Sequence, residues 1–267
     1  MKLFIMGILL LCAPQVISAD LKPVFQTPPN IPAAKRPVRT TFDQLINAIE
    51  NSNIKGIHDL LEQFPDLVDQ SDTNGWNPFH YAALSGNLAA AKILGSLING
   101  RWWFQPSPWR AQNSNKDTPA AVAITAGKHD MVKYLVELRN DYDVNALILL
   151  TLVYNRVETF EYLFNRSDKT MLFAAIEQAS RQKASPEILF MLGKNLDYIP
   201  ASANEKNSVK QHIQFIFKNN PLPIACEFIR GYESCDNYGR VFPYEELLSP
   251  DQQQAVNDFI KYPEKYL

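Results

Sequence analysis

The side chains most able to bind a metal are four histidines and three cysteines. The histidines lie far apart in the sequence, and none has another candidate ligand at a spacing that suits zinc. They are His58, His80, His129 and His212. No Cys-x-x-Cys pair is present to supply thiolate ligands. We therefore expect no metal site and no cofactor.

Catalysis by a nucleophile or by paired acids is the next chemistry to consider. Cys226 could work with His212, but a cysteine close to a second cysteine in an exported chain is more often oxidised than catalytic. Glu245 with Glu246, and Asp66 with Asp69, are typical of solvated charge in surface turns. The nucleophile motif Gly-x-Ser-x-Gly is missing. These observations predict a protein that is not an enzyme.

The composition narrows the class of partner. The chain has 267 residues, of which 46% are hydrophobic, so it can bury a sizeable core. Its 26 Lys and Arg residues balance 28 Asp and Glu residues, and no window is densely basic. A nucleic acid is therefore not the expected partner.

Residues 1–19 have the pattern of a secretory signal peptide. Lys2 precedes an apolar run from Leu3 to Leu11, and the segment ends in small residues at Ser18 and Ala19. Lipidation at Cys12 is an alternative, although its preceding residue, Leu11, is not small. The run is too short to cross a bilayer, so we expect no membrane insertion of the mature chain. The prediction is an exported protein, periplasmic or secreted.

Two further features concern the mature chain. Residues 20–40 carry five prolines and no helical period, which predicts an extended or mobile leader. Cys226 and Cys235 remain once residues 1–19 are removed, and an even pair in an exported chain predicts a disulfide. Two reduced thiols are the alternative.

From Thr41 onward the sequence repeats itself. The segment NSNIKGIHDLL (51–61) superposes on LSGNLAAAKIL (84–94) with a shift of 33 residues, and each joins a polar turn to an amphipathic helix. Similar segments follow at 125–135 and 153–163, and a weaker one ends at Leu192. The spacing varies, with 41 residues from Gly86 to Gly127 and 28 from Gly127 to Asn155. This pattern predicts a solenoid of stacked helix pairs.

The turns before these helices resemble the ankyrin repeat. DTNGWNPFHYAALSGN (72–87) and KDTPAAVAITAGKHDMVKYL (116–135) carry its signature positions. The first segment matches at Asp72, Gly75, Pro78, His80, Ala82, Ala83 and Gly86, and the second at Thr118, Pro119, Ala123, Gly127, Val132, Lys133 and Leu135. Asn77 stands in place of the usual threonine, Ala121 in place of the usual histidine, and the repeat from Asp143 lacks the Thr-Pro turn.

The resemblance implies an all-α, ankyrin-like helix-pair solenoid over residues 41–195. Residues 196–267 show helices without the repeat signature, at 209–219 and 250–262, and are expected to form a helical C-terminal cap. The resemblance also implies that His80 is structural and bonds the backbone of its turn and the neighbouring turn.

The stretch INGRWWFQPSPWRAQN (98–113) holds three of the four tryptophans. It falls where ankyrin-like repeats project a finger, and the 41-residue spacing exceeds 33, so it is interpreted as an insertion there. The predicted contact residues are Trp76, Trp102, Trp103 and Trp109, with Arg101 and Arg110 at the rim. The alternative is that these rings pack back on the solenoid, and the sequence leaves both open.

The expected function is non-catalytic protein binding by a monomer. One alternative is an exported enzyme or small-ligand binder, with its site between the solenoid and the C-terminal region. Another is an effector that is delivered to a second cell. The sequence does not identify the partner.

Overall fold

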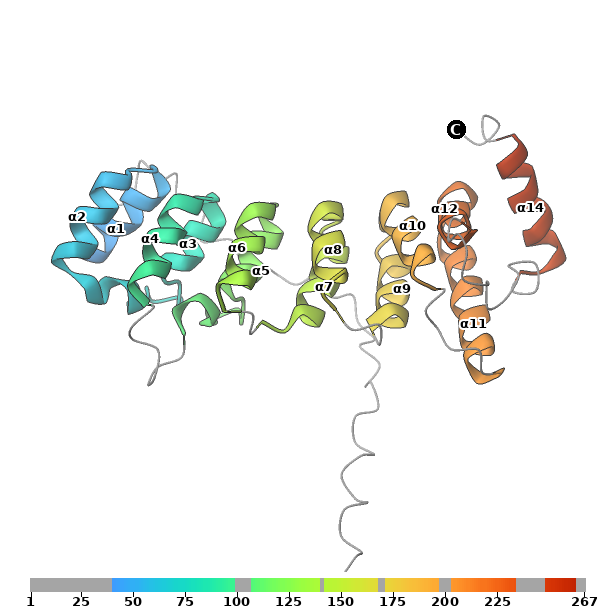
Figure 1. Cartoon of the computed structure of the whole chain (residues 1–267), viewed down its shortest axis with the longest axis horizontal. Coiled ribbons are helices and arrows are strands. Elements are labelled where there is room, and N and C mark those ends of the chain that lie inside the picture. Colours follow the sequence, from blue (N-terminus) through green and yellow to red (C-terminus); the bar gives the residue numbers. More distant parts are fainter. Residues whose placement is uncertain are drawn as a thin grey trace, which may run out of the picture.

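The computed structural model describes residues 40–98, 107–139, 142–167, 171–196, 203–233 and 248–262. Within these ranges all regular structure is helical, which confirms the predicted all-α class. Twelve of the helices form six pairs that follow one another along the long axis of the molecule (Figure 1).

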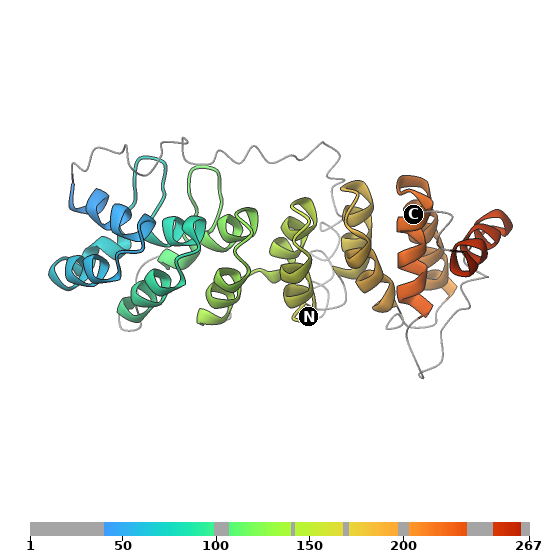
Figure 2. The same ribbon diagram turned by 90° about the horizontal axis from the view of Figure 1, so that it is seen from above.

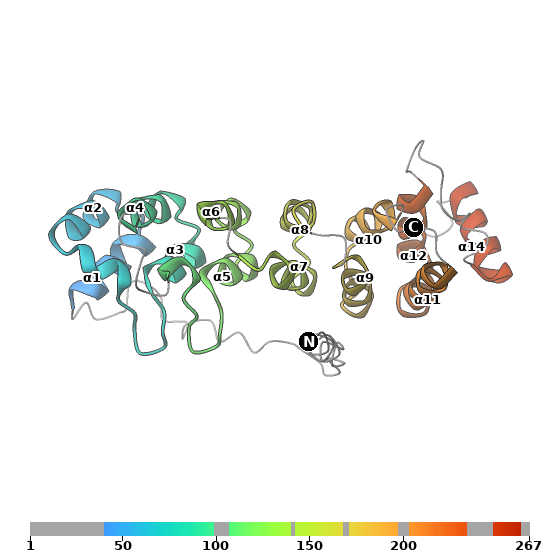
Figure 3. The same ribbon diagram turned by 60° about the horizontal axis from the view of Figure 1, so that its bottom comes forward.

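In each pair, one helix belongs to an inner row and the other to an outer row (Figure 3). The inner row contains α1 (Thr41–Glu50), α3 (Pro78–Ser85), α5 (Pro119–Thr125), α7 (Val144–Val153), α9 (Leu172–Arg181) and α11 (Ala203–Asn219). The outer row contains α2 (Ile54–Gln63), α4 (Leu88–Ile98), α6 (His129–Arg139), α8 (Val157–Phe164), α10 (Pro186–Lys194) and α12 (Leu222–Glu233). Each helix contacts the next of its own row, so the stack is continuous.

Three shorter or terminal elements complete the fold. The 3-10 helices η2 (Pro65–Asp69) and η3 (Pro108–Arg110) precede the second and third pairs, and α14 (Pro250–Lys261) packs on α12. The region expected to be a cap therefore begins with a sixth pair, α11 and α12, that continues both rows. Only α14 lies beyond the stacked pairs in the described part of this region (Figure 1).

The turn between the two helices has the same backbone conformation in each of the first five pairs. One residue adopts a left-handed conformation, and the next amide donates to a carbonyl five residues earlier, as in a Schellman turn. The left-handed residues are Ser52, Gly86, Gly127, Asn155 and Lys183. Ser52 and Gly86 are 34 positions apart, so the structural shift between the first two pairs is 34 residues and not 33.

Small residues at those carbonyls let the helices approach closely. The acceptors are the carbonyls of Ala48, Ala82, Ala123, Thr151 and Ala179. Each of these side chains is at most 6% exposed. A larger side chain there would push neighbouring pairs apart, which explains the small residue at this position in all five turns.

The helix starts follow local chemistry. Thr40 and Asp43 form a reciprocal capping box at α1, and Asn77 with His80 forms one at α3. Pro78 and Pro119 occupy the first turns of α3 and α5, where no helical N–H bond is lost. The side chain of Asp143 caps α7 in the repeat that lacks the Thr-Pro turn.

Candidate binding surface

Two hairpin turns, at 70–77 and 111–118, project from the inner row between α1 and α5 (Figure 2). In the first, one carboxylate oxygen of Asp72 accepts the N–H groups of Asn74 and Trp76, at 2.8 Å each. In the second, the side-chain oxygen of Asn113 accepts those of Asn115 and Asp117, at 2.9 Å each. An Asx side chain thus fixes each turn.

The hairpins are equivalent residue by residue with a shift of 41. Gly75 and Lys116 hold the same left-handed position, with φ of 74° and 67°. The N–H of Ser114 donates to the carbonyl of Asn74 at 2.9 Å and joins the two turns. The same shift pairs η2 with η3, so Trp109 takes the place of Val68 in the preceding repeat.

Trp76 and Trp109 are buried, with 5% and 2% of their surface exposed. The ring of Trp76 packs against His80 and Tyr81, with centroids 5.5 Å apart in both cases. The carbonyl of Trp109 accepts a hydrogen bond from the hydroxyl of Tyr142. These two rings pack within the solenoid, which was the alternative left open by the sequence. A buried ring has no face that a partner could contact. Their assignment as contact residues is corrected accordingly.

The additional residues of the third repeat lie before Pro108. Arg101, Trp102 and Trp103 fall outside the described residues, and their role as contacts stays a prediction. Arg110, at the end of η3, is exposed, and its role at the rim also stays a prediction.

His80 is structural, as predicted. It is fully buried, and its Nε2 lies 3.0 Å from the carbonyl of Asp117 in the next hairpin. The N–H of Asn77 donates to its Nδ1 at 3.2 Å. Burial lowers the pKa of His80 to about 4, so the ring is neutral near pH 7 and donates through Nε2–H. This histidine couples two repeats and has no free nitrogen for catalysis.

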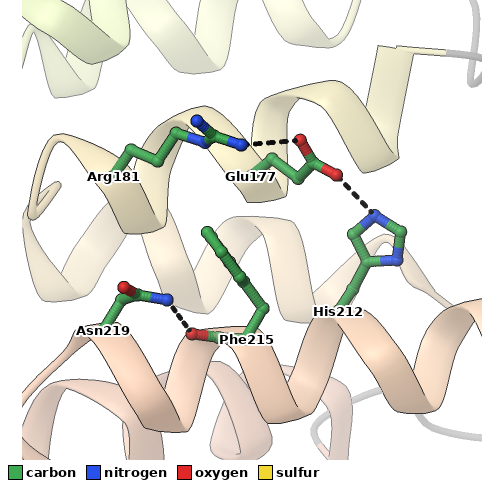
Figure 4. A network of polar contacts seen from close by, with 5 residues as sticks. All are labelled: Glu177, Arg181, His212, Phe215 and Asn219. Carbon is green, nitrogen blue, oxygen red and sulfur yellow. Dashed lines mark hydrogen bonds and ion pairs between the residues drawn. The ribbon is translucent and has the colours of Figure 1, made fainter. Parts of the chain in front are cut away.

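A cluster of rings and charges lies where α9 meets α11 on the inner row. The carboxylate of Glu177 is 3.7 Å from the guanidinium of Arg181 and 3.6 Å from Nε2 of His212. Figure 4 shows Glu177 between these two side chains, with Phe215 on the same face of α11. The Arg181 guanidinium lies over the Phe215 ring, 5.7 Å from its centroid. We call Phe173, Glu177, Arg181, His212 and Phe215 the inner cluster.

Sequence reasoning missed this cluster. The side chain of His212 is only 15% exposed and stacks on Phe173, with ring centroids 4.5 Å apart. The helix period of 209–219 places His212 and Phe215 on one face of α11. It does not say that α9 lies against that face, because nothing in 196–267 resembles the repeat.

A groove of about 480 Å³ crosses the outer row at α8, α10 and α12. Its lining combines apolar side chains with acids and one arginine. They are Val157, Glu161, Pro186, Glu187, Phe190, Met191, Glu227 and Arg230. Arg230 is already paired with Glu227, with a shortest N–O distance of 3.0 Å. The groove lies at the junction with the C-terminal region, where the alternative ligand site was expected.

The remaining described candidates for chemistry are buried or lie beside polar partners. Cys226 is buried in α12, and burial raises the pKa of its thiol to about 12, which suppresses the thiolate that a nucleophile needs. Cys235 lies outside the described residues, so the disulfide stays a prediction. His129 is held by Thr159 and Glu158, and His58 lies beside Glu62. No group of metal ligands occurs among the described residues.

A family comparison agrees with the geometry of the first two helix pairs. Residues 45–94 match the family model described as ankyrin repeats (many copies). Among solved structures, the chain is similar to the ankyrin repeat domain of human ASB11, with a TM-score of 0.41 and 15% identity. That alignment covers 80% of this chain and 96% of the other. A comparison with curated proteins gave no match.

The family match includes the first two helix pairs and the first hairpin turn, which carry the buried His80 and the capping box of α3. The same helix pair and left-handed turn recur beyond residue 94, as far as Lys183. Residues 45–94 therefore match ankyrin repeats, and the described chain is an all-helical, ankyrin-like solenoid.

Proposed function

We propose that this protein is a non-catalytic module that binds a protein partner through its inner row and hairpin turns. Ankyrin repeats suggest such a module, because stacked pairs create an extended surface for binding. The observation that carries the choice of surface is the inner cluster. It combines two aromatic rings with an arginine and a glutamate that are about half exposed, at 48% and 50% of their side chains.

Aromatic and arginine side chains supply much of the binding energy at protein interfaces. In the inner cluster the fold holds Arg181 over Phe215 before any partner arrives, which reduces the entropy cost of ordering it. Arg101, Trp102 and Trp103, with Arg110 at the rim, would extend the same interface at the third repeat. This extension is the aromatic insertion inferred from the sequence.

We also propose that the chain acts outside the cytoplasm as a monomer, after loss of residues 1–19. The support is the signal-peptide pattern at Lys2, Leu3–Leu11 and Ala19. In the described ranges no helix has the length and apolar character to cross a membrane. Mass spectrometry of the protein recovered from each cell fraction tests this part, because export requires a mature N-terminus near residue 20.

The binding surface can be tested with a matched pair of variants. Arg166 follows α8 of the outer row and, like Arg181, has an aromatic ring and a glutamate as neighbours: its guanidinium is 4.8 Å from the Tyr162 ring centroid and 3.8 Å from Glu137. Its side chain is 43% exposed, close to the 48% of Arg181. Arg166→Glu is therefore the control for Arg181→Glu.

Immobilised wild type and both variants would be exposed to the same extract or secreted fraction, and the retained proteins quantified. We expect a partner that wild type and Arg166→Glu retain but Arg181→Glu loses at least tenfold. Equal retention by all three proteins would contradict binding at the inner cluster. Circular dichroism would verify that each variant keeps its helices.

The outer groove supports a second candidate function, the binding of a small apolar ligand. Phe190 and Met191 supply apolar surface beside Glu161, Glu187 and Arg230. A solvent-sensitive dye titrated into wild type and Met191→Lys would test it. We expect a saturable increase in dye fluorescence with the wild type only. An equal increase with Met191→Lys would exclude this candidate function.

A further inference from the structure

A second hollow, of about 800 Å³, lies at the N-terminal end of the solenoid. Its walls come from the start of α1, the end of α2 with η2, and the first hairpin turn. Thr40, the first described residue, is part of the wall. Whatever precedes Thr40 therefore starts at this hollow.

The described wall is acidic. Asp43, Asp66 and Asp72 line it, and no lysine or arginine is among its described residues. The fold fixes two of these carboxylates. Asp43 accepts the N–H of Thr40 at 2.9 Å, and Asp72 accepts the hydroxyl of Tyr81 at 2.8 Å. Charges held in place keep a constant field at the hollow and lose no entropy when a cation approaches.

The hollow also exposes a large apolar side chain. Phe64, which follows α2, is 43% exposed and lines it. The first pair of a solenoid has no repeat stacked on the face that points away from the second pair, and such end faces need a covering element. An occupant that suits this end therefore carries positive charge and at least one apolar side chain.

The segment directly before Thr40 has that chemistry. Residues 35–39 read KRPVR, with three cations and one valine in five positions. We propose that this segment of the leader docks in the hollow at the N-terminal end of the solenoid. Val38 supplies an apolar side chain that suits Phe64, and Arg36 and Arg39 supply charges opposite to those of the acidic wall.

The tether favours this occupant over a separate molecule. A segment joined to the wall through Thr40 has an effective concentration in the millimolar range, so weak charge pairs are enough to hold it. Pro37 also limits the freedom that the segment loses on docking. The inference is independent of the proposed function, because it concerns the end of the stack and not the inner cluster.

A charge-swap cycle on the full chain tests the docking. Arg36→Glu combined with Arg39→Glu is expected to lower Tm by roughly 2–4 °C at low salt. Adding Asp66→Lys to that variant is expected to restore at least half of the loss. In 0.5 M salt the differences should disappear, because exposed charges are screened. Lys22→Glu, in the same leader but distant from Thr40, is the control and should not change Tm.

A second comparison tests the apolar part of the contact. Phe64 and Ile54 are exposed to nearly the same extent, at 43% and 40%, but only Phe64 lines the hollow. Phe64→Ala should lower Tm by a few degrees, and Ile54→Ala should leave it almost unchanged.

Three results would overturn the proposal. The first is an effect of the Arg36 and Arg39 reversals on Tm that simply adds to the effect of Asp66→Lys, which would mean that the charges do not interact. The second is an equal fall in Tm for Phe64→Ala and Ile54→Ala. The third is saturable binding of an added KRPVR peptide by the wild-type chain, because the hollow would then be open.

Discussion

The first three helix pairs and the last three are joined by different contacts. In the first three, hairpin turns bond across repeats: Nδ2 of Asn77 donates to the carbonyl of Pro108 at 2.7 Å, and His80 bonds Asp117. In the last three, the fifth and sixth pairs meet through the backbones of their outer helices. A Cβ added to Gly193 of α10 would lie 2.0 Å from the carbonyl oxygen of Phe228 on α12.

The difference shows which part of the repeat is essential to the stack. The left-handed turn and its small residue occur in both halves, at Gly86 and Ala82 in one and at Lys183 and Ala179 in the other. The described hairpins occur only in the first half. The helix pair is therefore the unit that stacks, and the hairpin is an addition that joins neighbouring pairs through polar contacts.

The largest effect is expected in the first half, at Trp109. Trp109→Ala should lower the free energy of unfolding by about 3–5 kcal/mol, because it empties a core position that Val68 fills in the preceding repeat. Urea unfolding measures the loss. Val68→Ala is the matched change and should cost less, since it removes fewer atoms. A loss below about 1 kcal/mol for Trp109→Ala would contradict a core role for this ring.

The next effect belongs to the second half, where backbones meet. Gly193→Ala should destabilise the protein by about 3 kcal/mol, because the added methyl group meets a carbonyl that cannot move alone. Gly95→Ala is the control. Its Cβ would lie 2.2 Å from the hydroxyl of Tyr134, which can rotate away at the cost of one hydrogen bond to Ala91. We expect about 1 kcal/mol for that variant in urea unfolding, and equal losses would refute the close contact of α10 with α12.

A fall in pH should change the free energy of unfolding through His80, which lies in the first half. Its pKa is about 4 in the folded protein against 6.5 when unfolded, so only the unfolded state gains a proton as pH falls from 6.5 to 4, and stability drops. Asp117 acts in the opposite direction. Burial raises the pKa of its carboxyl to about 6 from 3.8, so the folded state gains a proton first and stability rises as pH falls through 6.

The two contributions offset each other in the wild-type protein, and Asp117→Asn separates them. In that variant we expect stability to fall by about 2 kcal/mol between pH 6.5 and 4, measured by urea unfolding across the range. A further His80→Gln change should remove most of this fall. An unchanged pH profile in Asp117→Asn would exclude the offset.

The smallest effect concerns the left-handed turns. Lys183 holds φ of 51° in the second half, where the first half uses glycine at Gly86 and Gly127. Lys183→Gly should raise stability by about 0.5–1 kcal/mol, because glycine adopts this conformation without strain. Gly86→Ala should lower stability by a similar amount. Differential scanning calorimetry on the pair would detect both signs, and a loss for Lys183→Gly would mean that its side chain contributes to the turn.

Much of the architecture could be predicted because its determinants are local. Asn77 and Pro78 specify a helix start, Gly86 specifies a turn, and the apolar spacing of 84–94 specifies the face that packs. The structural role of His80 followed from its place in the turn. The register of the first two repeats was predicted wrongly by one residue. The left-handed position of the first pair is held by Ser52 and not by a glycine, so the sequence comparison matched Asn53 to Gly86 and gave a shift one residue too short.

The candidate site was harder to predict because it depends on contacts between distant segments. Trp109 was assigned to an insertion because the spacing from Gly86 to Gly127 does not show where the additional residues enter. The structure places η3 on the equivalent of η2, so the ring falls in the core. The inner cluster joins residues more than 30 positions apart, such as Glu177 and His212.

By itself the sequence determined the helices, their turns and the ankyrin type of the stack, because capping and periodicity act within a few residues. Tertiary structure decided which aromatic rings are buried, where α11 and α12 join the rows, and which charges gather on α9 and α11. Those outcomes depend on how each pair covers the apolar face of the next, and no local pattern records that.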